Sequence, residues 1–449
     1  MRKPFPLRHA LGAAFAGLLA ATAPLPASAS TFDLLQAWES ALERDATTRA
    51  ARAGAESARE ALPQARGQLL PNLSLSASWY RNDVERNRSE TQTLPDEAYN
   101  SSNETLTLRQ PIWRKPLLAG LEQARHVVED ADATMARALS TLAMRVTGAY
   151  LEALLAQDQI DLIESQRVLT EAQLDAARKA LAAGSGTRTD VDEALSRLDL
   201  NTAQRLEAKL ALEVARRELE VLVDRPLGTL ARLDPSRLAL EPPVPDTLDA
   251  WIRTAEANSP EIRSLQAKRD VARRDVDRQR GGHHPTLDAV AQVIRSSSEN
   301  VNTPAWGYTN RLLGVQLNIP LYAGGTVQSL VRQALAEEAR AEAALEATRR
   351  DLGLRIHKEF RGVVEGTAKI RAYEQAVRSA QQMVTSSRRS FEAGARTTVD
   401  ILNAEQQRQG ALRDLAQARY MWLASQVRLE ALSGGDPYTT LARVNATLR

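Results

Sequence analysis

The feature that most constrains the fold of this chain is an internal duplication. Residues 66–73 correspond to residues 280–287, and Gly184 corresponds to Gly394, with about 210 residues separating the two members of each pair. A single duplication of this period predicts two similar halves rather than a stack of many short repeats.

Each half is predicted to run through the same series: helix, strand, loop, strand, very long helix, turn and returning helix. We assign residues 30–225 to the first repeat and residues 246–434 to the second. Residues 226–245, rich in Pro and Asp, are interpreted as a linker or equatorial segment. Residues 435–449 form a C-terminal equatorial segment in the same interpretation.

Long helices dominate both repeats. Over residues 117–146 the apolar residues recur every three or four positions, which gives one narrow apolar stripe on an otherwise charged helix. The longest predicted helices would each reach about 100 Å, a length that a globular domain does not need. The predicted helices are Phe32–Gly67, Leu117–Ala183 and Thr189–Val223 in the first repeat, and Leu248–Gly281, Val327–Ala393 and Thr398–Ser433 in the second.

The first 29 residues predict export from the cytoplasm. Residues 1–29 have a basic start, a short apolar run and the ending Ala27-Ser28-Ala29, which is typical of a cleaved secretory signal peptide. They hold three of the 58 basic residues and none of the 56 acidic ones, so the rest of the chain is nearly neutral and no nucleic acid is expected as a partner. The absence of cysteine excludes disulfides, thiolate metal sites and a lipid-modified N-terminal cysteine.

Four short segments between the helices alternate between apolar and polar residues. They include Leu73, Leu106, Leu287 and Leu313, and their period of two predicts a sheet with one apolar and one polar face. No stretch after residue 29 is long and apolar enough for a membrane-spanning helix, so an exported chain of this kind would enter a membrane as strands. Two interpretations compete: a soluble sheet that covers a core, and a membrane barrel with lipid outside and water inside.

Aromatic residues at both ends of these segments favour the barrel, since such rings match the girdles of outer-membrane barrels. The predicted girdle comprises Trp79, Tyr80, Trp306 and Tyr308 at one end, and Trp113 and Tyr322 at the other. Four strands cannot close a barrel, because the smallest barrels have about eight and open edges are not tolerated in lipid. Several copies must therefore pool their strands. Three copies are the obvious closed solution, while two would leave little lumen.

Taken together, these features resemble the TolC family of outer-membrane export ducts, over nearly the whole chain after the signal peptide. The matching pieces are the duplicated helix-to-strand junctions, the returning strands that end near residues 110–113 and 319–325, and the helix turns at residues 184–191 and 394–401. The resemblance implies an α+β membrane protein. Its long α-helical coiled-coil barrel would continue into a transmembrane β-barrel, with four strands from each chain of a homotrimer. It also implies the cell outer membrane as the location, with the helices extending into the periplasm.

The resemblance further implies a passive, gated duct that works with a periplasmic adaptor protein and an inner-membrane ABC or proton-driven transporter. Type I protein secretion is favoured over multidrug or other small-molecule efflux, because the lipidation cysteine is missing and both helix turns carry Arg-Thr pairs. A periplasmic coiled-coil scaffold without a channel is a further alternative, but it gives no reason for amphipathic strands with aromatic ends. No catalytic or nucleotide-binding motif is recognisable, so we expect no enzyme activity, no cofactor and no metal site.

In the family, the helix turns form a periplasmic tip that closes the duct and docks the adaptor. Asp400 matches the position of an acidic ring facing the pore, and such a ring would attract cations. Asn403 stands where the family often has a second acid, and Phe391 stands where it has a gate tyrosine. The turns expected to dock the adaptor contain Gly184, Ser185, Gly186, Gly394 and Ala395.

Arg396 matches a family residue that ties its helix to a Thr-Asp pair of a neighbouring helix, here Thr189 and Asp190. The residues by themselves allow another interpretation. Asp190 and Asp400 each follow a threonine by three positions, so both also fit capping boxes that begin the returning helices. The two roles are compatible with each other.

Overall fold

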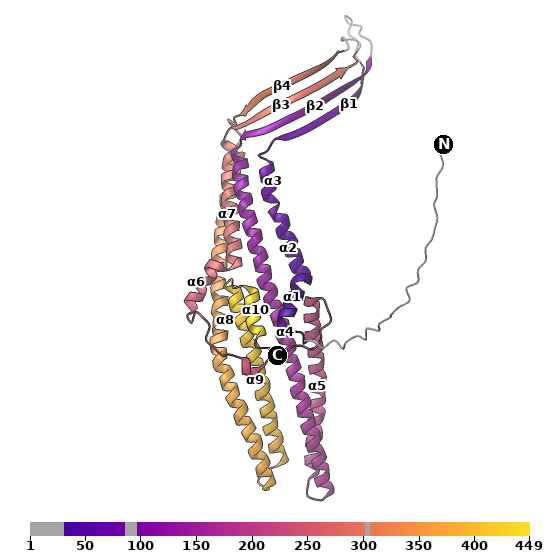
Figure 1. Cartoon of the computed structure of the whole chain (residues 1–449), viewed down its shortest axis with the longest axis vertical. Coiled ribbons are helices and arrows are strands. Elements are labelled where there is room, and N and C mark those ends of the chain that lie inside the picture. The colour runs from indigo at the N-terminus through magenta and orange to yellow at the C-terminus, as the bar shows by residue number, and fades with distance from the viewer. Residues whose placement is uncertain (1–30, 86–96, 301–305) are drawn as a thin grey trace, which may run out of the picture.

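The computed structural model describes residues 31–85, 97–300 and 306–449. The predicted signal peptide, residues 1–29, lies outside the described residues. Figure 1 shows an elongated molecule with a sheet at one end and two helical hairpin turns at the other. The N-terminal end of the described chain and the C-terminus both lie near the middle of the helical part.

The two halves contain the same succession of elements, although the division into repeats is itself our interpretation. The first half comprises α1 (Leu34–Arg44), α2 (Ala46–Arg59), α3 (Ala61–Gly67), β1 (Asn72–Val84), β2 (Glu97–Trp113), α4 (Lys115–Ala182) and α5 (Arg188–Val223). The second comprises α6 (Leu248–Asn258), α7 (Pro260–Arg280), η2 (Gly281–His283), β3 (Thr286–Ser298), β4 (Trp306–Asn318), α8 (Thr326–Glu392) and α9 (Thr398–Leu432). The short η1 (Pro235–Arg237) and α10 (Pro437–Asn445) lie beside the middle of the long helices (Figure 1).

The predicted ends of the long helices lie within two residues of the observed ends, and α4 alone spans 68 residues. Among the helices of the described chain, none combines the length and the apolarity needed to cross a membrane.

The first helix of each half is interrupted, where the sequence predicted one continuous helix. The side chain of Asp45 accepts hydrogen bonds from the amide and the hydroxyl of Thr48, at 2.8 Å each, and so begins α2 as an N-cap. In the second half Ser259 precedes Pro260, the first residue of α7. Pro lacks an amide hydrogen and fits the first helical position but not a helix interior, so α6 ends there.

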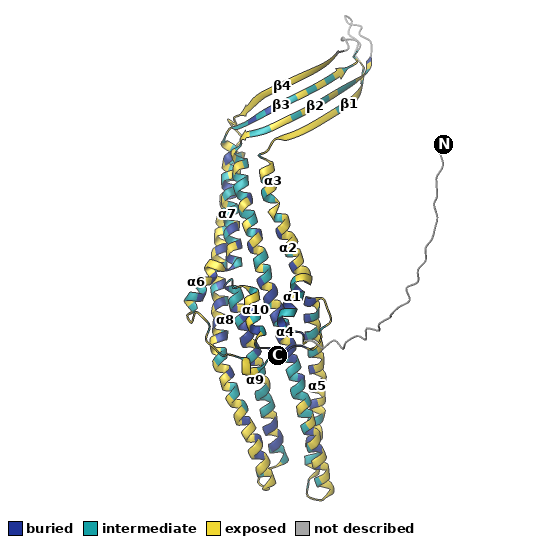
Figure 2. Ribbon diagram, viewed as in Figure 1, coloured by how far each residue is buried: buried dark blue, intermediate teal, exposed yellow. Residues whose placement is uncertain are grey.

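The strands form one antiparallel sheet in the order β1-β2-β3-β4. Its register places most apolar residues of the four strands on one face, since Leu73, Leu108, Ala291 and Leu313 follow one another across it. The adjacent set of paired residues points to the opposite face and includes the polar side chains of Ser74, Thr107 and Gln292. The described chain leaves the apolar face uncovered at its outer strands: Leu75 of β1 and Leu313 of β4 are exposed, and both strands are mainly yellow in Figure 2.

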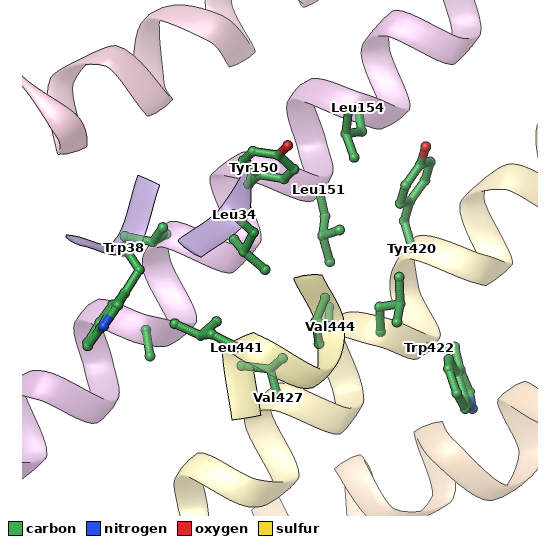
Figure 3. Close-up of a cluster of buried hydrophobic side chains, with 14 of the residues drawn as sticks. Leu34, Trp38, Tyr150, Leu151, Leu154, Tyr420, Trp422, Val427, Leu441 and Val444 are labelled. Carbon is green, nitrogen blue, oxygen red and sulfur yellow. The ribbon is translucent and has the colours of Figure 1, made fainter. Parts of the chain in front are cut away.

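A hydrophobic core lies midway along the helices, away from the sheet (Figure 2), and Figure 3 shows part of it. Tyr150 of α4 is completely buried in it, and its hydroxyl donates hydrogen bonds to the carbonyl oxygens of Phe32 and Ala231, at 2.9 and 3.0 Å. Leu441 and Val444 of α10 pack into the same core. The linker and the C-terminal segment therefore contribute to the packing at this level.

Candidate functional site

The turns at the tips require glycine. Gly184 and Gly394 have φ angles of 74° and 78°, a left-handed conformation that glycine adopts without strain. In the first turn the amides of Ser185 and Gly186 both donate to the carbonyl oxygen of Ala180, at 3.0 and 3.1 Å, which satisfies the end of α4. A Cβ atom on Gly186 would lie 2.9 Å from the backbone nitrogen of Leu181, so this position has no room for a side chain.

Both returning helices begin with the capping boxes that the sequence predicted. In α9 the amide and the hydroxyl of Thr397 donate to a carboxylate oxygen of Asp400, at 2.9 and 2.8 Å. In α5 the equivalent groups of Thr187 donate to Asp190, at 3.2 and 2.6 Å. The bonds from Thr397, with a smaller contribution from Arg396, hold the pKa of Asp400 below its usual value. Asp400 is therefore ionised at neutral pH.

The other predicted tip residues lie around these turns, but one chain does not bring them all together. Arg396 donates to the hydroxyl of Ser387 at 3.2 Å. Within the described residues of a single chain it forms no hydrogen bond to Thr189 or Asp190. The predicted tie to a neighbouring helix therefore stays a prediction for the assembled protein. Phe391, in the last turn of α8, is exposed.

Asn403 already has a partner, which the sequence reasoning missed. A guanidinium nitrogen of Arg197, on α5, donates to the side-chain oxygen of Asn403 at 2.8 Å. The only sequence signal of this arginine is Glu193, four residues earlier on the same helix, with which it forms an ion pair at 2.8 Å. Nothing in a single sequence indicates that its side chain also reaches a second hairpin.

A second ion-pair cluster near the tip was also not predicted. The carboxylate of Glu405 is only 2% exposed, and it accepts hydrogen bonds from Arg388 at 2.6 Å and from Arg408 at 3.0 Å. Arg388 lies on α8 and Arg408 on α9, so Glu405 joins the two helices of one hairpin. A buried carboxylate is tolerated because two cations compensate it.

At the other end of the helices, an ion pair joins the sheet to the long helices. Arg114, the residue between β2 and α4, donates through Nε to Asp288 of β3 at 2.8 Å and forms a second hydrogen bond to the same carboxylate. The side chain of Asp288 is only 6% exposed. Gln110 of β2 also donates to the carbonyl oxygen of Leu69 at 2.9 Å, which ties the strand to the segment between α3 and β1. The junction is thus held by side chains from both repeats.

The predicted aromatic girdle divides between the two faces of the sheet. Trp79 belongs to the apolar face and is 69% exposed, and Trp113 pairs with Leu287 of that face. Tyr80 and Tyr308 fall on the polar face by strand alternation. Tyr322 follows β4 and is exposed, and Trp306 is the first residue of β4. The girdle interpretation therefore applies best to Trp79, Trp113 and Tyr322.

The described part of the chain contains no group of three or more His, Cys, Asp or Glu side chains positioned to hold a metal ion. His284 lies beside Lys115, with 3.2 Å between the two nitrogen atoms. The expectation that the protein needs no metal and no cofactor stays a prediction.

The sheet has one apolar face and is joined to the ends of long helical hairpins. This is the form of a subunit of an outer-membrane channel. The chain belongs to the outer membrane efflux protein family, whose model matches residues 37–224 and 251–435. The family predicted from the sequence is thereby confirmed, and with it the class of outer-membrane export channel.

The proteases secretion protein PrtF of Dickeya chrysanthemi is 33% identical, over 91% of this chain and 89% of that protein. The alkaline protease secretion protein AprF of Pseudomonas aeruginosa is 34% identical, over 89% of this chain and 84% of that protein. Among solved structures, CusC superposes with a TM-score of 0.79 at 15% identity, covering 91% of this chain and 93% of that one. That likeness confirms the predicted fold class.

Proposed function

We propose that three copies of this chain form a passive duct through the outer membrane that carries secreted proteins out of the cell. One observation carries the proposal: the four-stranded sheet exposes its apolar face and pairs neither the outer edge of β1 nor that of β4 within the described chain. In lipid such edges must pair, so β1 of one copy is expected to meet β4 of the next. Three copies then give a closed barrel wide enough for a water-filled lumen.

Protein secretion is favoured over small-molecule efflux by similarity. Both relatives described above are named for the secretion of proteases, and each matches most of this chain. In this function the duct would receive its cargo from an inner-membrane transporter through a periplasmic adaptor, for which the turns at Gly184 and Gly394 are the proposed docking points. The protein itself is proposed to have no enzyme activity. The transporter would supply the energy.

The proposed constriction lies at the tips, where Asp400 is ionised and three copies would place three carboxylates around one axis. Such a ring favours cations over anions. Asp400 can attract cations at the constriction and also cap α9, since both roles require its charged carboxylate.

A matched pair of substitutions tests the lipid-facing sheet. Leu313 and Leu312 are neighbours in β4, but Leu313 lies on the apolar face and Leu312 on the opposite one. Arginine on the lipid face costs about 2–4 kcal/mol near the bilayer midplane, whereas a lumen position tolerates it. We expect Leu313→Arg to abolish the heat-labile, SDS-resistant oligomer in the outer-membrane fraction, and Leu312→Arg to retain it. Equal assembly of the two variants would contradict the membrane barrel.

The cargo is tested in a bacterium that lacks its own duct but expresses the partner adaptor and transporter of this chain. Expression of this chain should restore the appearance of the transported protein in the culture medium. Restored resistance to small toxic compounds without protein secretion would instead support the efflux alternative.

A further inference from the structure

The two helical hairpins of one chain are held together unevenly. Below the central core, α4 packs on α5 and α8 packs on α9, and the two pairs run side by side to the tips (Figure 1). The hairpins meet mainly through α4 and α9, whereas α5 and α9 touch at few positions. Between α4, α5 and α9 lies a groove of about 540 Å³. Few side chains therefore join α5 directly to α9.

Arg197 crosses this gap. Its Nη2 atom donates to the side-chain oxygen of Asn403 at 2.8 Å, and its Nη1 atom lies 3.4 Å from the side-chain oxygen of Gln406. Asn403 and Gln406 are three residues apart and lie on one face of α9. The Nε atom of Arg197 meanwhile donates to Glu193, one turn earlier on its own helix, at 2.8 Å.

The arrangement uses the particular geometry of arginine. The planar guanidinium presents a rigid fork of donors, so it can hold Glu193 with one edge and reach the two amides of α9 with the other. Glu193 compensates the charge, and the side chain of Arg197 is only 21% exposed, whereas its two acceptors on α9 are exposed. A lysine would keep the charge but could not reproduce this fork.

We propose that Arg197 is a positioning residue of the tip: it latches the α4–α5 hairpin to the α8–α9 hairpin and so sets the width of the opening. The proposal rests on the proposed function as a duct with a constriction at the tips. Loss of the latch lets α9 shift relative to α5, and the ring of Asp400, three residues before Asn403, widens with it.

Single-channel conductance in planar bilayers tests this proposal. Arg197→Ala is expected to raise the conductance at least about twofold, because conductance follows the cross-section of the narrowest point. Arg197→Lys is expected to raise it as well, since the charge remains but the fork is lost. The matched control is Arg217→Ala, which removes an arginine of the same helix whose ion pair, among the described residues, is with Glu220 within α5. This control should conduct like the wild type.

A second variant keeps Arg197 and removes its acceptors. The double substitution Asn403→Ala with Gln406→Ala should raise conductance to the same extent, and adding Arg197→Ala to it should produce no further rise. An increase with Arg197→Ala but not with Arg197→Lys would mean that charge alone acts, and would overturn the latch. Wild-type conductance in all these variants would overturn it too. A wild-type protein that forms no channel at all would instead refute the proposed function.

Discussion

The residue that most clearly couples the membrane part to the periplasmic part is Arg114. Its guanidinium holds the nearly buried carboxylate of Asp288, so its removal leaves that carboxylate without its hydrogen-bonded cation and with only the weaker influence of Arg109. We expect Arg114→Ala to reduce stability by about 3 kcal/mol. The loss should appear as a lower thermal unfolding midpoint of the purified protein in detergent.

The matched control for this prediction is Arg125→Ala. Arg125 pairs with Glu122 at 2.7 Å, but both side chains are well exposed to solvent. An exposed pair contributes less than about 1 kcal/mol, so the midpoint should hardly change. Equal effects of the two substitutions would show that the ion pair of Arg114 and Asp288 contributes no more to stability than an exposed ion pair does.

A half-buried acid on α4, Asp158, predicts a pH dependence. Burial raises the pKa of Asp158, and the hydrogen bond from Tyr420 and the charges of Arg232 and Arg419 offset this only in part, while Asp161 adds to it. A carboxyl whose pKa is raised by folding stabilises the fold while it is protonated, and this contribution is lost as the pH rises through the raised pKa. The ionised Asp158 is thus a cost at neutral pH.

Asp158→Asn should therefore raise the thermal midpoint at pH 7.5, since the amide oxygen can still accept from Tyr420 without carrying a charge. The difference from the wild type should shrink as the pH is lowered through the raised pKa, because Asp158 then becomes protonated. A difference that stays constant from pH 4 to pH 7.5 would show that its ionisation does not matter. The measurement is circular dichroism of the helices during heating.

At the scale of elements, the sequence predicted those whose signal is local. The helices α4, α5, α8 and α9 follow from apolar periodicity and from glycine at the turns, and the four strands follow from strict alternation. The interruption at Asp45 was not predicted, because the apolar pattern continues through this residue. Asp45 nevertheless caps α2 in the ordinary way, since its side chain accepts a hydrogen bond from the amide of Thr48. The helix α10 was missed because nine residues carry too weak a pattern.

The helix α10 nevertheless contributes to the core, which leads to a stability prediction. Leu441 is fully buried against the central cluster shown in Figure 3, whereas Tyr438 of the same helix is 53% exposed. Leu441→Ala should cost about 2–5 kcal/mol through lost burial and the cavity that remains. Tyr438→Ala should leave the thermal midpoint nearly unchanged. A similar loss in both would indicate that α10 acts through its backbone alone.

The candidate tip residues were predicted only in part, because a sequence pattern reports contacts between residues that are close in the chain. The capping pairs and the glycines could be identified because their roles depend on neighbours in sequence. Arg197 and Glu405 depend on partners in a second helix, and a single sequence does not specify which residues meet across helices. The same holds for Arg114 and Asp288, which lie 174 residues apart in the chain.

At the scale of the whole molecule, the central claim is that three copies close one barrel by pairing β1 of each copy with β4 of the next. Because the chain has no cysteine, two introduced cysteines report on this contact without interference. Leu75 of β1 and Val315 of β4 are exposed, lie close to the ends of their strands that join the helices, and face the same side of the sheet. Within one chain β2 and β3 separate them.

The most direct measurement is cross-linking of the variant Leu75→Cys with Val315→Cys in outer membranes by a flexible bifunctional maleimide, followed by full denaturation. A barrel closed by three copies gives covalent species of one, two and three chains and none larger, while a protein with only one of the two cysteines stays monomeric. A ladder that continues beyond three chains, or no cross-linking in the double variant, would rule out the barrel of three copies.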